Sequence, residues 1–336
     1  MNRLLALPSR PASLRLLVLA VSDRCDQRCA HCQIWMGPEA GREPNLTLEQ
    51  RVAVVEEALA MGIEECLLTG GEPLLSADLW PIAERLQRGG VRSLLATNGL
   101  LLATYAREVA ALFAEVYVSL DGAHAETHDA LRGVPSFDRV AAGAAAIRAI
   151  TPRPLLVARA TLHRRNLGEF GELVESARRI GFDHVSFLPI DVSSPAFGGR
   201  VEARQPLAPT AEQIDGFGAA VQALDRRGGF ADGFILESPR KLDRLADHLR
   251  ASAGLGSFGA PECDAPWWSS VVEADGAVKP CFFHASVGQA GDGLRRTRES
   301  EAQRRALAEV RRGKATCDAC VCPKRRGLSM RERLFA

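Results

Sequence analysis

The chain has 336 residues, of which 46% are hydrophobic and 25% are charged, and its formal net charge is +1. This balance is typical of a globular protein with one large core and a smaller module, and it provides no overall field that would attract nucleic acid or an anionic membrane. No apolar stretch is long enough to cross a bilayer. The nine cysteines form a tight N-terminal trio and a spread C-terminal group, with Cys66 alone in an apolar run. Such grouping favours metal ligation in a reducing compartment, so we expect a cytoplasmic protein.

Short β-branched or leucine-rich runs alternate with longer amphipathic runs, the pattern of repeated βα units around a parallel sheet. Strands are predicted at residues 14–21, 65–69, 93–96, 116–120, 155–161 and 184–189. Helices are predicted at residues 47–61, 79–88, 101–113, 137–150 and 167–180. Thr47 and Gln50 have the spacing of an N-terminal capping box. Six such strands predict an α/β protein with a partial (β/α)6 barrel, in which functional groups gather at the C-terminal ends of the strands.

Three cysteines follow the first predicted strand directly. Cys25, Cys29 and Cys32 have C-x3-C-x2-C spacing, and no fourth cysteine lies nearby. Thiolates are the ordinary ligands of iron-sulfur clusters, so three of them can hold three irons of a four-iron cluster and leave one iron open. A zinc site is the alternative, but zinc requires a fourth ligand, and His31 lies between two of the cysteines instead of beyond them.

This spacing resembles the radical S-adenosylmethionine (radical SAM) superfamily, in which the methionine amino and carboxylate groups of S-adenosylmethionine chelate the open iron of a [4Fe-4S] cluster. Gly70, Gly71, Glu72 and Pro73 follow the second predicted strand and resemble the superfamily's motif for the methionine amino group. The glycines allow the backbone to approach a ligand closely, and Glu72 offers an acceptor to an ammonium group. The two motifs together favour a site for S-adenosylmethionine.

The resemblance implies further cofactor-binding side chains. Asn98, Ser119 and Asp121 are candidates for the ribose hydroxyls, and Arg159 is a candidate for the carboxylate. His31 occupies the position where the superfamily often has an aromatic residue near the adenine. Polar residues that end strands are also frequent in turns and caps.

Two further segments carry polar side chains. His124 and His128 could share a helix face, but because no third ligand is in register we expect orientation or capping instead of metal binding. Arg132, in the same segment, could order the mouth of the barrel. Residues 191–209 form a long loop rich in Ser, Pro and Gly, which suggests a substrate lid. Its polar candidates are Asp191, Ser193 and Arg200.

Helices are predicted again at residues 210–226, 239–250 and 299–312, and a linker at residues 254–261. Beyond this linker lie five more cysteines: Cys263, Cys281, Cys317, Cys320 and Cys322. Residues 270–273 and 277–280 predict a hairpin that brings the first two together, and the last predicted helix returns the C-x2-C pair to them. Four thiolates close a site completely, and either of the last two cysteines could be the fourth ligand.

This layout resembles the Twitch module, a short relative of the SPASM domain that carries one auxiliary [4Fe-4S] cluster. A zinc ribbon is the alternative, because paired cysteines also bind zinc. We therefore expect a radical SAM barrel over residues 1–235, followed by a linker helix and an auxiliary-cluster domain over residues 236–336.

The resemblance implies an enzyme in which a one-electron donor such as flavodoxin or ferredoxin reduces the first cluster. This cluster then cleaves S-adenosylmethionine, and the 5'-deoxyadenosyl radical abstracts hydrogen from the substrate. The auxiliary cluster could accept the electron left on the substrate radical, or it could tune the chemistry and bind the substrate. We expect oxidation or rearrangement of a small polar metabolite such as a sugar, an aminocyclitol or an antibiotic precursor. The sequence assigns no catalytic acid, base or second hydrogen donor.

Two other functions remain open. The chain could modify a ribosomally made peptide, although peptide-modifying relatives commonly carry an N-terminal domain for which the residues before the first strand leave no room. It could also be a non-catalytic iron-sulfur electron carrier or scaffold, which would not need residues 70–73.

Overall fold

The computed structural model describes residues 8–36, 45–199, 201–259, 263–313, 315–324 and 326–327. The chain divides into two compact units. Unit 1 comprises Met1–Arg24, Met36–Leu95 and Ala260–Ala336, and unit 2 comprises Cys25–Trp35 and Ala96–Gly259. None of the helices in the described ranges is long and apolar enough to cross a membrane.

Unit 1 is built on a sheet with the strand order β3, β2, β1, β7, β8, β9. The strands are β1 (Leu16–Ser22), β2 (Glu65–Gly70), β3 (Arg92–Thr97, whose last two residues belong to unit 2), β7 (Ser269–Val272), β8 (Ala277–Lys279) and β9 (Gly288–Gln289). β1 pairs in parallel with both β2 and β7, and β8 pairs with β7 in the antiparallel sense. All residues of β1 are buried, as expected for the interior of a parallel sheet. The C-terminal hairpin therefore extends the sheet that contains the first strand.

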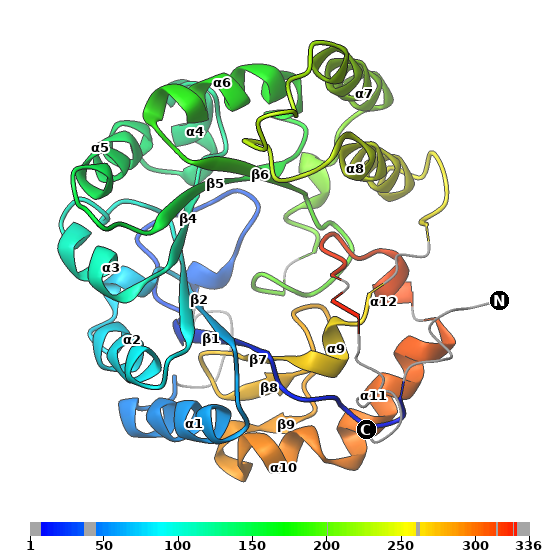
Figure 1. Cartoon of the computed structure of the whole chain (residues 1–336). Coiled ribbons are helices and arrows are strands. Elements are labelled where there is room, and N and C mark those ends of the chain that lie inside the picture. The colour runs from blue at the N-terminus through cyan, green and yellow to red at the C-terminus, as the bar shows by residue number, and fades with distance from the viewer. Residues whose placement is uncertain are drawn as a thin grey trace. The chain divides into compact units, whose positions relative to one another are not determined.

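Eight helical segments belong to unit 1: α1 (Leu48–Ala60), a 3-10 turn (Pro73–Leu75), α2 (Leu79–Arg88), α9 (Ala265–Trp268), a 3-10 turn (Ala290–Asp292), α10 (Leu294–Arg298), α11 (Glu301–Arg312) and α12 (Ala315–Asp318), counting only the described residues. α1 packs against α2 and α10 (Figure 1). The predicted capping box is confirmed: the Thr47 hydroxyl accepts a hydrogen bond from the Gln50 amide (3.3 Å), and the Thr47 amide donates to Gln50 Oε1 (2.8 Å).

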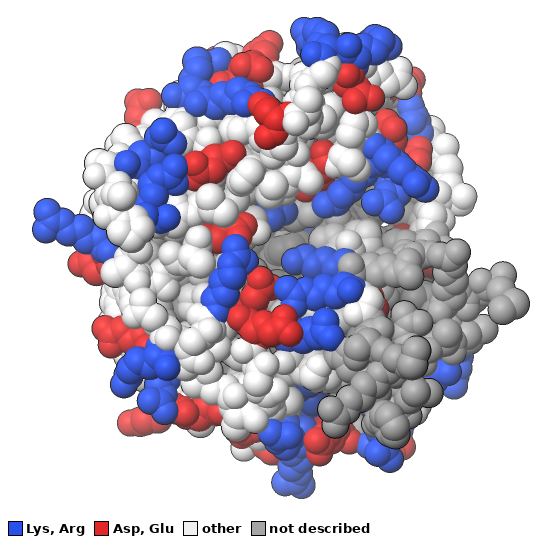
Figure 2. All heavy atoms as spheres, in the orientation of Figure 1, with Lys and Arg blue, Asp and Glu red and all other residues white. Residues whose placement is uncertain are grey.

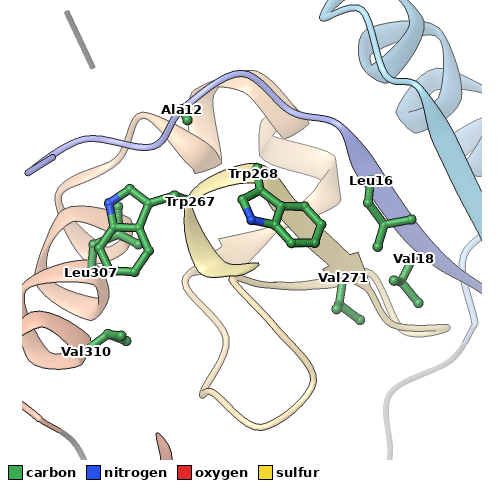
Figure 3. Close-up of a cluster of buried hydrophobic side chains, with 8 residues drawn as sticks. All are labelled: Ala12, Leu16, Val18, Trp267, Trp268, Val271, Leu307 and Val310. Atoms are coloured by element: carbon green, nitrogen blue, oxygen red, sulfur yellow. The ribbon is translucent and has the colours of Figure 1, made fainter. Parts of the chain in front are cut away.

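A cluster of apolar side chains joins the N-terminal strand of unit 1 to its C-terminal helices. The members are Ala12, Leu16, Val18, Trp267, Trp268, Val271, Leu307 and Val310. In Figure 3 the indole of Trp267 lies on the side of Leu307, and the indole of Trp268 lies on the side of Leu16. At about 25 cal/mol per Å² and roughly 150–250 Å² per aromatic side chain, burial of each indole contributes about 4–6 kcal/mol before conformational entropy is subtracted.

Unit 2 contains the parallel strands β4 (Glu115–Ser119), β5 (Leu155–Leu162) and β6 (His184–Pro189), with β5 in the centre. Its α-helices are α3 (Ala106–Leu112), α4 (Ala125–Arg132), α5 (Phe137–Arg148), α6 (Phe170–Ile180), α7 (Ala211–Arg226) and α8 (Pro239–Ser252). Short 3-10 turns occur at Leu167–Glu169 and Gln205–Leu207. α7 and α8 lie side by side in this unit (Figure 1).

The structure confirms the α/β class, all six predicted barrel strands and the β7–β8 hairpin. Cys66 is fully buried in β2, as expected for a core thiol. Several helices differ from the prediction: the short helices α9, α10 and α12 were not predicted. α3 begins at Ala106 instead of residue 101, because residues 101–105 form turns, and α4 was not predicted as a separate helix. The compact units also do not divide at residues 235/236, because β7 pairs with β1 and α8 packs against α7.

Charged side chains of both signs are interspersed on the face of the molecule in Figure 2, in keeping with the net charge of +1. Exposed ion pairs among the described residues include Arg305 with Glu301 and Arg250 with Asp215. Exposed pairs of this kind contribute at most about 1 kcal/mol each. Exposed charges of this kind therefore interact mainly with water and add little to the stability of the fold.

Candidate metal and cofactor sites

Residues 25–35 of unit 2, which we call the cysteine loop, carry the three N-terminal thiols. All nine cysteines lie within the described residues, and none of them is in a disulfide. The loop is fixed to the C-terminal end of α4, because the Arg28 amide donates to the carbonyl oxygen of Arg132 and the Ala30 amide to that of Leu131, both at 3.0 Å. Gly133 ends α4 with φ 74°, and a Cβ there would lie 2.7 Å from the Arg28 carbonyl oxygen. Glycine is thus required for this close approach.

The three thiols of the loop share one electrostatic environment. Burial raises the pKa of Cys29 to about 11, while the Arg132 guanidinium opposes this rise and the charge of Cys32 adds to it. Burial lowers the pKa of Arg132, but Cys29 and Asp121, with a smaller effect from Cys25, raise it above its usual value. The thiols and one buried cation therefore interact within this unit. That donor set suits an anionic iron-sulfur cluster, whose binding deprotonates the thiols.

Arg132 is the centre of a buried hydrogen-bond network. Its Nη1 donates to Asp121 Oδ2 (2.8 Å) and its Nε donates to Gln27 Oε1 (2.7 Å). The Thr161 amide donates to the other oxygen of Asp121 (2.8 Å). Burial raises the pKa of Asp121, but the charges of His31 and Arg132 and the Thr161 amide outweigh it and lower that pKa to about 2. The Asp121 carboxylate is therefore occupied by protein donors, and its role toward the ribose stays a prediction.

Three histidines lie around this network. His31 Nε2 is 3.9 Å from Asp121 Oδ2, and the His31 ring centroid is 5.9 Å from that of His163. His128 Nδ1 accepts a hydrogen bond from the Asp121 amide (3.1 Å), so His128 orients the end of β4, in line with the prediction. Burial lowers the pKa of all three histidines. It lowers that of His128 to about 4 and that of His163 to about 3. Burial therefore disfavours the protonated form of all three rings, and the buried Arg132 guanidinium is a cation that donates a hydrogen bond to Asp121.

The other predicted side chains of unit 2 lie in or directly after its strands. Asn98 Nδ2 donates to Asp26 Oδ1 (2.7 Å) and lies 4.0 Å from Cys25 Sγ, so it contacts the cysteine loop directly. Ser119 and Arg159 are register partners on β4 and β5. The Arg159 guanidinium stacks 4.7 Å above the Tyr117 ring. Asn98 thus lies beside the predicted cluster ligands, whereas Ser119 ends β4 and Arg159 lies within β5 as its register partner.

Gly70, Gly71, Glu72 and Pro73 lie in unit 1, where β2 ends. The Gly71 amide donates to Ser22 O (2.7 Å) and the Glu72 amide to Arg24 O (2.8 Å). A Cβ on Gly71 would lie 2.2 Å from Arg24 O, and one on Gly70 (φ 136°) would lie 2.1 Å from Ser22 O. The two glycines are therefore required for this packing against the residues that directly precede Cys25 in the sequence.

Glu72 is completely buried. Its Oε1 accepts a hydrogen bond from the Leu74 amide (3.0 Å), which caps the 3-10 turn that begins at Pro73. A buried carboxylate requires a cation or further donors to offset its desolvation. Glu72 therefore has the burial and charge suited to a ligand's ammonium group.

The C-terminal cysteines come together in unit 1. Cys263, Cys281, Cys317 and Cys320 line a pocket with an empty volume of about 370 Å³, part of it open to solvent. Burial raises the pKa of Cys281 to about 12, and Cys322, Cys263 and Cys317 all add to this rise. His284 also lines the pocket, with its Nε2 3.4 Å from Cys317 Sγ. A hydrogen bond with Cys322, together with burial, raises the pKa of Cys320, so Cys322, the other candidate for the last ligand, lies beside a residue that lines the pocket.

Asp264 connects the two ends of this thiol group. Its amide donates to Lys324 O (3.0 Å), and its carboxylate accepts hydrogen bonds from the amides of Arg326 (3.0 Å) and Gly327 (2.9 Å). The Lys324 amide in turn points at Cys263 Sγ (3.4 Å). Sequence reasoning missed Asp264, although its position directly after Cys263 was a signal.

The spread of the thiols bears on the kind of metal. Among the described residues, no three His, Cys, Asp or Glu side chains converge tightly enough to hold a single ion. The C-terminal thiols instead surround a pocket. The C-terminal thiols are therefore grouped at one site, and the choice between an iron-sulfur cluster and zinc stays a prediction.

The predicted lid loop is held by a buried ion pair in unit 2. Arg204 is almost completely buried, and its Nη1 lies 3.7 Å from Asp191 Oδ2. Asp191 Oδ1 also accepts hydrogen bonds from Ser193 N (2.9 Å) and Ser193 Oγ (3.1 Å). The Phe197 carbonyl accepts a hydrogen bond from the Gln33 amide (2.9 Å), so the predicted lid loop packs on the cysteine loop. Arg200 lies outside the described residues.

Comparison with known proteins gives the class to which these features belong. Residues 19–177 match the family model of the Radical SAM superfamily. The chain therefore carries a radical SAM domain, and the cofactors of that class are a [4Fe-4S] cluster and S-adenosylmethionine.

Named relatives match about half of the chain. An AdoMet-dependent heme synthase of Methanosarcina barkeri is 35% identical over 52% of this chain and 50% of its own length. A GTP 3',8-cyclase of Marinobacter nauticus is 32% identical over 51% of this chain and 52% of its own length. The chain thus spans about half the length of these curated relatives.

Solved structures share the fold over most of the chain. Streptococcus suis SuiB bound to the precursor peptide SuiA superposes with a TM-score of 0.64, at 14% identity, over 94% of this chain and 72% of SuiB. anSMEcpe with bound AdoMet and a peptide gives a TM-score of 0.65, at 18% identity, over 91% of this chain and 86% of its own. The predicted partial barrel of the radical SAM type is confirmed as the fold class.

Proposed function

We propose that this chain is a radical SAM enzyme that removes a hydrogen atom from a small polar metabolite, in a net oxidation or rearrangement. The radical SAM domain supports the reaction class. The relatives at more than 30% identity are named for reactions of heme and GTP, which supports a small-molecule substrate. The likeness to the peptide-bound structures lies below 20% identity and extends to the fold alone.

The observation that carries the proposal is the cysteine loop fixed to α4. In the proposal, Cys25, Cys29 and Cys32 hold a [4Fe-4S] cluster and leave one iron for S-adenosylmethionine. When bound and reduced, these cofactors supply the radical that removes the hydrogen atom. The backbone bonds of Arg28 and Ala30 to α4 fix the spacing of the ligands before the cluster binds.

The remaining predicted residues bind S-adenosylmethionine in this proposal. Glu72 accepts the ammonium group, and the Gly70–Gly71 backbone leaves room for it. His31 faces the adenine, Asn98, Ser119 and Asp121 face the ribose, and Arg159 pairs with the carboxylate. The burial of Glu72 supports the first of these roles, because a charged acceptor in a low-dielectric site binds a cation strongly.

The C-terminal cysteines hold the auxiliary [4Fe-4S] cluster in this proposal. Cys263, Cys281 and Cys317 provide three ligands, and Cys320 or Cys322 provides the fourth. The pocket that they surround supports a cluster over a single zinc ion. The electron donor is a flavodoxin or a ferredoxin, and the enzyme works in the reducing cytoplasm, where thiols stay unoxidised.

Anaerobic reconstitution tests the proposal. The wild-type chain should hold about eight irons, because the thiols divide into three plus four. With dithionite and S-adenosylmethionine it should release methionine and 5'-deoxyadenosine. The triple variant Cys25→Ala, Cys29→Ala, Cys32→Ala should lose half of the iron and all of the cleavage.

Cys66→Ala is the matched control, since this thiol is buried in β2 and should affect neither readout. Iron that is unchanged in the triple variant, or zinc at the C-terminal thiols, would refute the assignment. Full iron without binding of S-adenosylmethionine would instead favour an electron carrier. Cleavage that is stimulated by a precursor peptide and by no small molecule would favour a peptide-modifying enzyme.

A further inference from the structure

Arg132 connects three parts of unit 2 from a buried position. Its carbonyl oxygen accepts the Arg28 amide, its Nε donates to Gln27 Oε1 and its Nη1 donates to Asp121 Oδ2. We propose that Arg132 is a positioning residue that fixes the cysteine loop and makes its cluster easier to reduce. This inference rests on the proposed function, because it requires a cluster on the three thiols.

The positioning part follows from the contacts of Gln27, which is completely buried in the cysteine loop. Gln27 Oε1 accepts the Arg132 Nε at 2.7 Å and lies 3.7 Å from Cys29 Sγ. Arg132 is thus linked to Cys29 through the Gln27 side chain, and to the loop backbone through the hydrogen bond from the Arg28 amide. Losing the guanidinium would leave the buried Gln27 Oε1 without its charged donor, which should loosen the cysteine loop and lower the iron occupancy of its cluster.

The charge part follows from the burial of Arg132 and its position beside a ligand. Its guanidinium is buried and donates a hydrogen bond to Gln27 Oε1, which lies 3.7 Å from Cys29 Sγ, so a positive charge is fixed close to this thiol. A positive charge stabilises the reduced cluster more than the oxidised one, because reduction adds negative charge. In a buried site with a low dielectric constant, water screens this attraction weakly. Removing Arg132 should therefore make reduction harder, and neutralising Asp121 should make it easier.

Arg204 is a second buried cation near the loop, because Cys32 opposes the lowering of its pKa by burial. It reaches the loop from residues 191–207 and is paired with Asp191. Among the described residues, the Arg204 side chain donates a hydrogen bond to the Ser194 carbonyl, which lies outside the cysteine loop. Its charge adds to that of Arg132, while the positioning role belongs to Arg132 alone.

The test compares reconstituted full-length variants by redox titration, in which the first cluster is identified as the one whose EPR signal changes when S-adenosylmethionine is added. Arg132→Gln should shift the midpoint potential of this cluster to a more negative value and lower its iron occupancy. Arg132→Lys keeps the charge but lacks the planar guanidinium that bonds to Gln27 and Asp121 at once. It should therefore lower the iron occupancy while shifting the midpoint potential less than Arg132→Gln does. Asp121→Asn should shift the potential in the positive direction.

Arg153→Gln is the matched control, because Arg153 forms a two-bond ion pair with Asp183 (2.6 and 2.7 Å) in the same unit. It should leave the potential and iron of the first cluster at wild-type values. A wild-type potential in Arg132→Gln, or shifts of the same sign in Arg132→Gln and Asp121→Asn, would overturn the charge role. If Arg132→Gln does not fold, Arg132→Lys and Asp121→Asn decide. A wild-type chain without iron on the first three thiols would refute the proposed function itself.

Discussion

The carboxylate of Asp264 accepts a hydrogen bond from Trp268 Nε1 at 2.7 Å. The same carboxylate receives the amides of Arg326 and Gly327, and the residue directly follows Cys263. One buried acid therefore ties the apolar cluster of unit 1 to the C-terminal thiol pocket. The stability of the core and the integrity of the auxiliary site should be coupled through it.

Asp264→Ala tests this coupling. The substitution leaves three buried or half-buried N–H donors without their acceptor, and we expect a loss of about 3 kcal/mol in the free energy of unfolding. Auxiliary iron should fall while the first cluster keeps its iron. Urea unfolding and iron analysis measure the two effects. Asp264→Asn keeps one acceptor oxygen and should lose less stability and less auxiliary iron than Asp264→Ala. Equal losses in the two variants would contradict the role of the carboxylate.

Gly71→Ala should destabilise the chain by about 1–3 kcal/mol, because the new Cβ would lie 2.2 Å from Arg24 O and the backbone would have to shift. Thermal unfolding gives the measurement. Gly171→Ala is the control: its Cβ would meet no atom within 4 Å, and Gly171 lies inside α6. That substitution should stabilise the chain by about 0.4–1 kcal/mol. A neutral Gly71→Ala would show that this turn tolerates a side chain.

Glu72→Gln should weaken binding of S-adenosylmethionine by about 10- to 100-fold, since a hydrogen bond to a charged group contributes about 1.5–3 kcal/mol. Glutamine keeps an acceptor for the Leu74 amide, so the cap and the first cluster should remain. Equilibrium binding to the reconstituted protein measures the effect. Glu172→Gln is the control, because it removes an exposed carboxylate that contacts His124. This variant should bind S-adenosylmethionine with wild-type affinity. Wild-type affinity in Glu72→Gln would exclude the ammonium role.

The free energy of unfolding should fall as the pH falls from about 7 toward 4. The pKa of His128 is about 4 in the folded chain and about 6.5 in the unfolded chain, so between these values the unfolded chain binds more protons. His128 contributes up to about 3 kcal/mol above pH 7, and this contribution is lost on acidification. His128→Asn keeps an acceptor without the titration, so its pH dependence should be shallower in urea unfolding. An unchanged slope would show that the pKa of His128 is the same in the folded and unfolded chains.

Removing an auxiliary ligand separates the two possible tasks of the second cluster. If this cluster takes the substrate electron, Cys281→Ser should still move deuterium from a labelled substrate into 5'-deoxyadenosine but should form no product. Mass spectrometry of both compounds gives the readout. Product at the wild-type rate would mean that the cluster is structural, and loss of deuterium transfer in a folded variant with its first cluster would make it a substrate-binding element.

Local patterns were sufficient to predict most of the barrel elements. Alternating apolar runs predicted β6 at the observed residues, and the Thr47–Gln50 pair predicted the start of α1. These signals are local, since they depend on side-chain periodicity and caps. The grouping of the five C-terminal cysteines also followed from their spacing and a hairpin signal.

Long-range contacts could not be predicted in this way. The pairing of β7 with β1 joins residues about 250 positions apart, and nothing in either run specifies its partner. The network of Arg132 depends on buried contacts with Gln27 and Asp121, which lie 105 and 11 positions away. Asp121 was predicted as a ribose ligand by resemblance, and nothing in the sequence specifies that its carboxylate also accepts a hydrogen bond from Arg132.

The pairing of β1 with β7 has a consequence for biosynthesis. During translation, β1 leaves the ribosome more than 240 residues before Ser269–Val272, so until then one edge of β1 has no strand beside it. An unpaired, apolar parallel strand is a template for aggregation. Expression of residues 1–259 alone should therefore yield insoluble chains, and coexpression of the missing C-terminal segment should restore solubility, because the late segment completes a sheet that the early one begins.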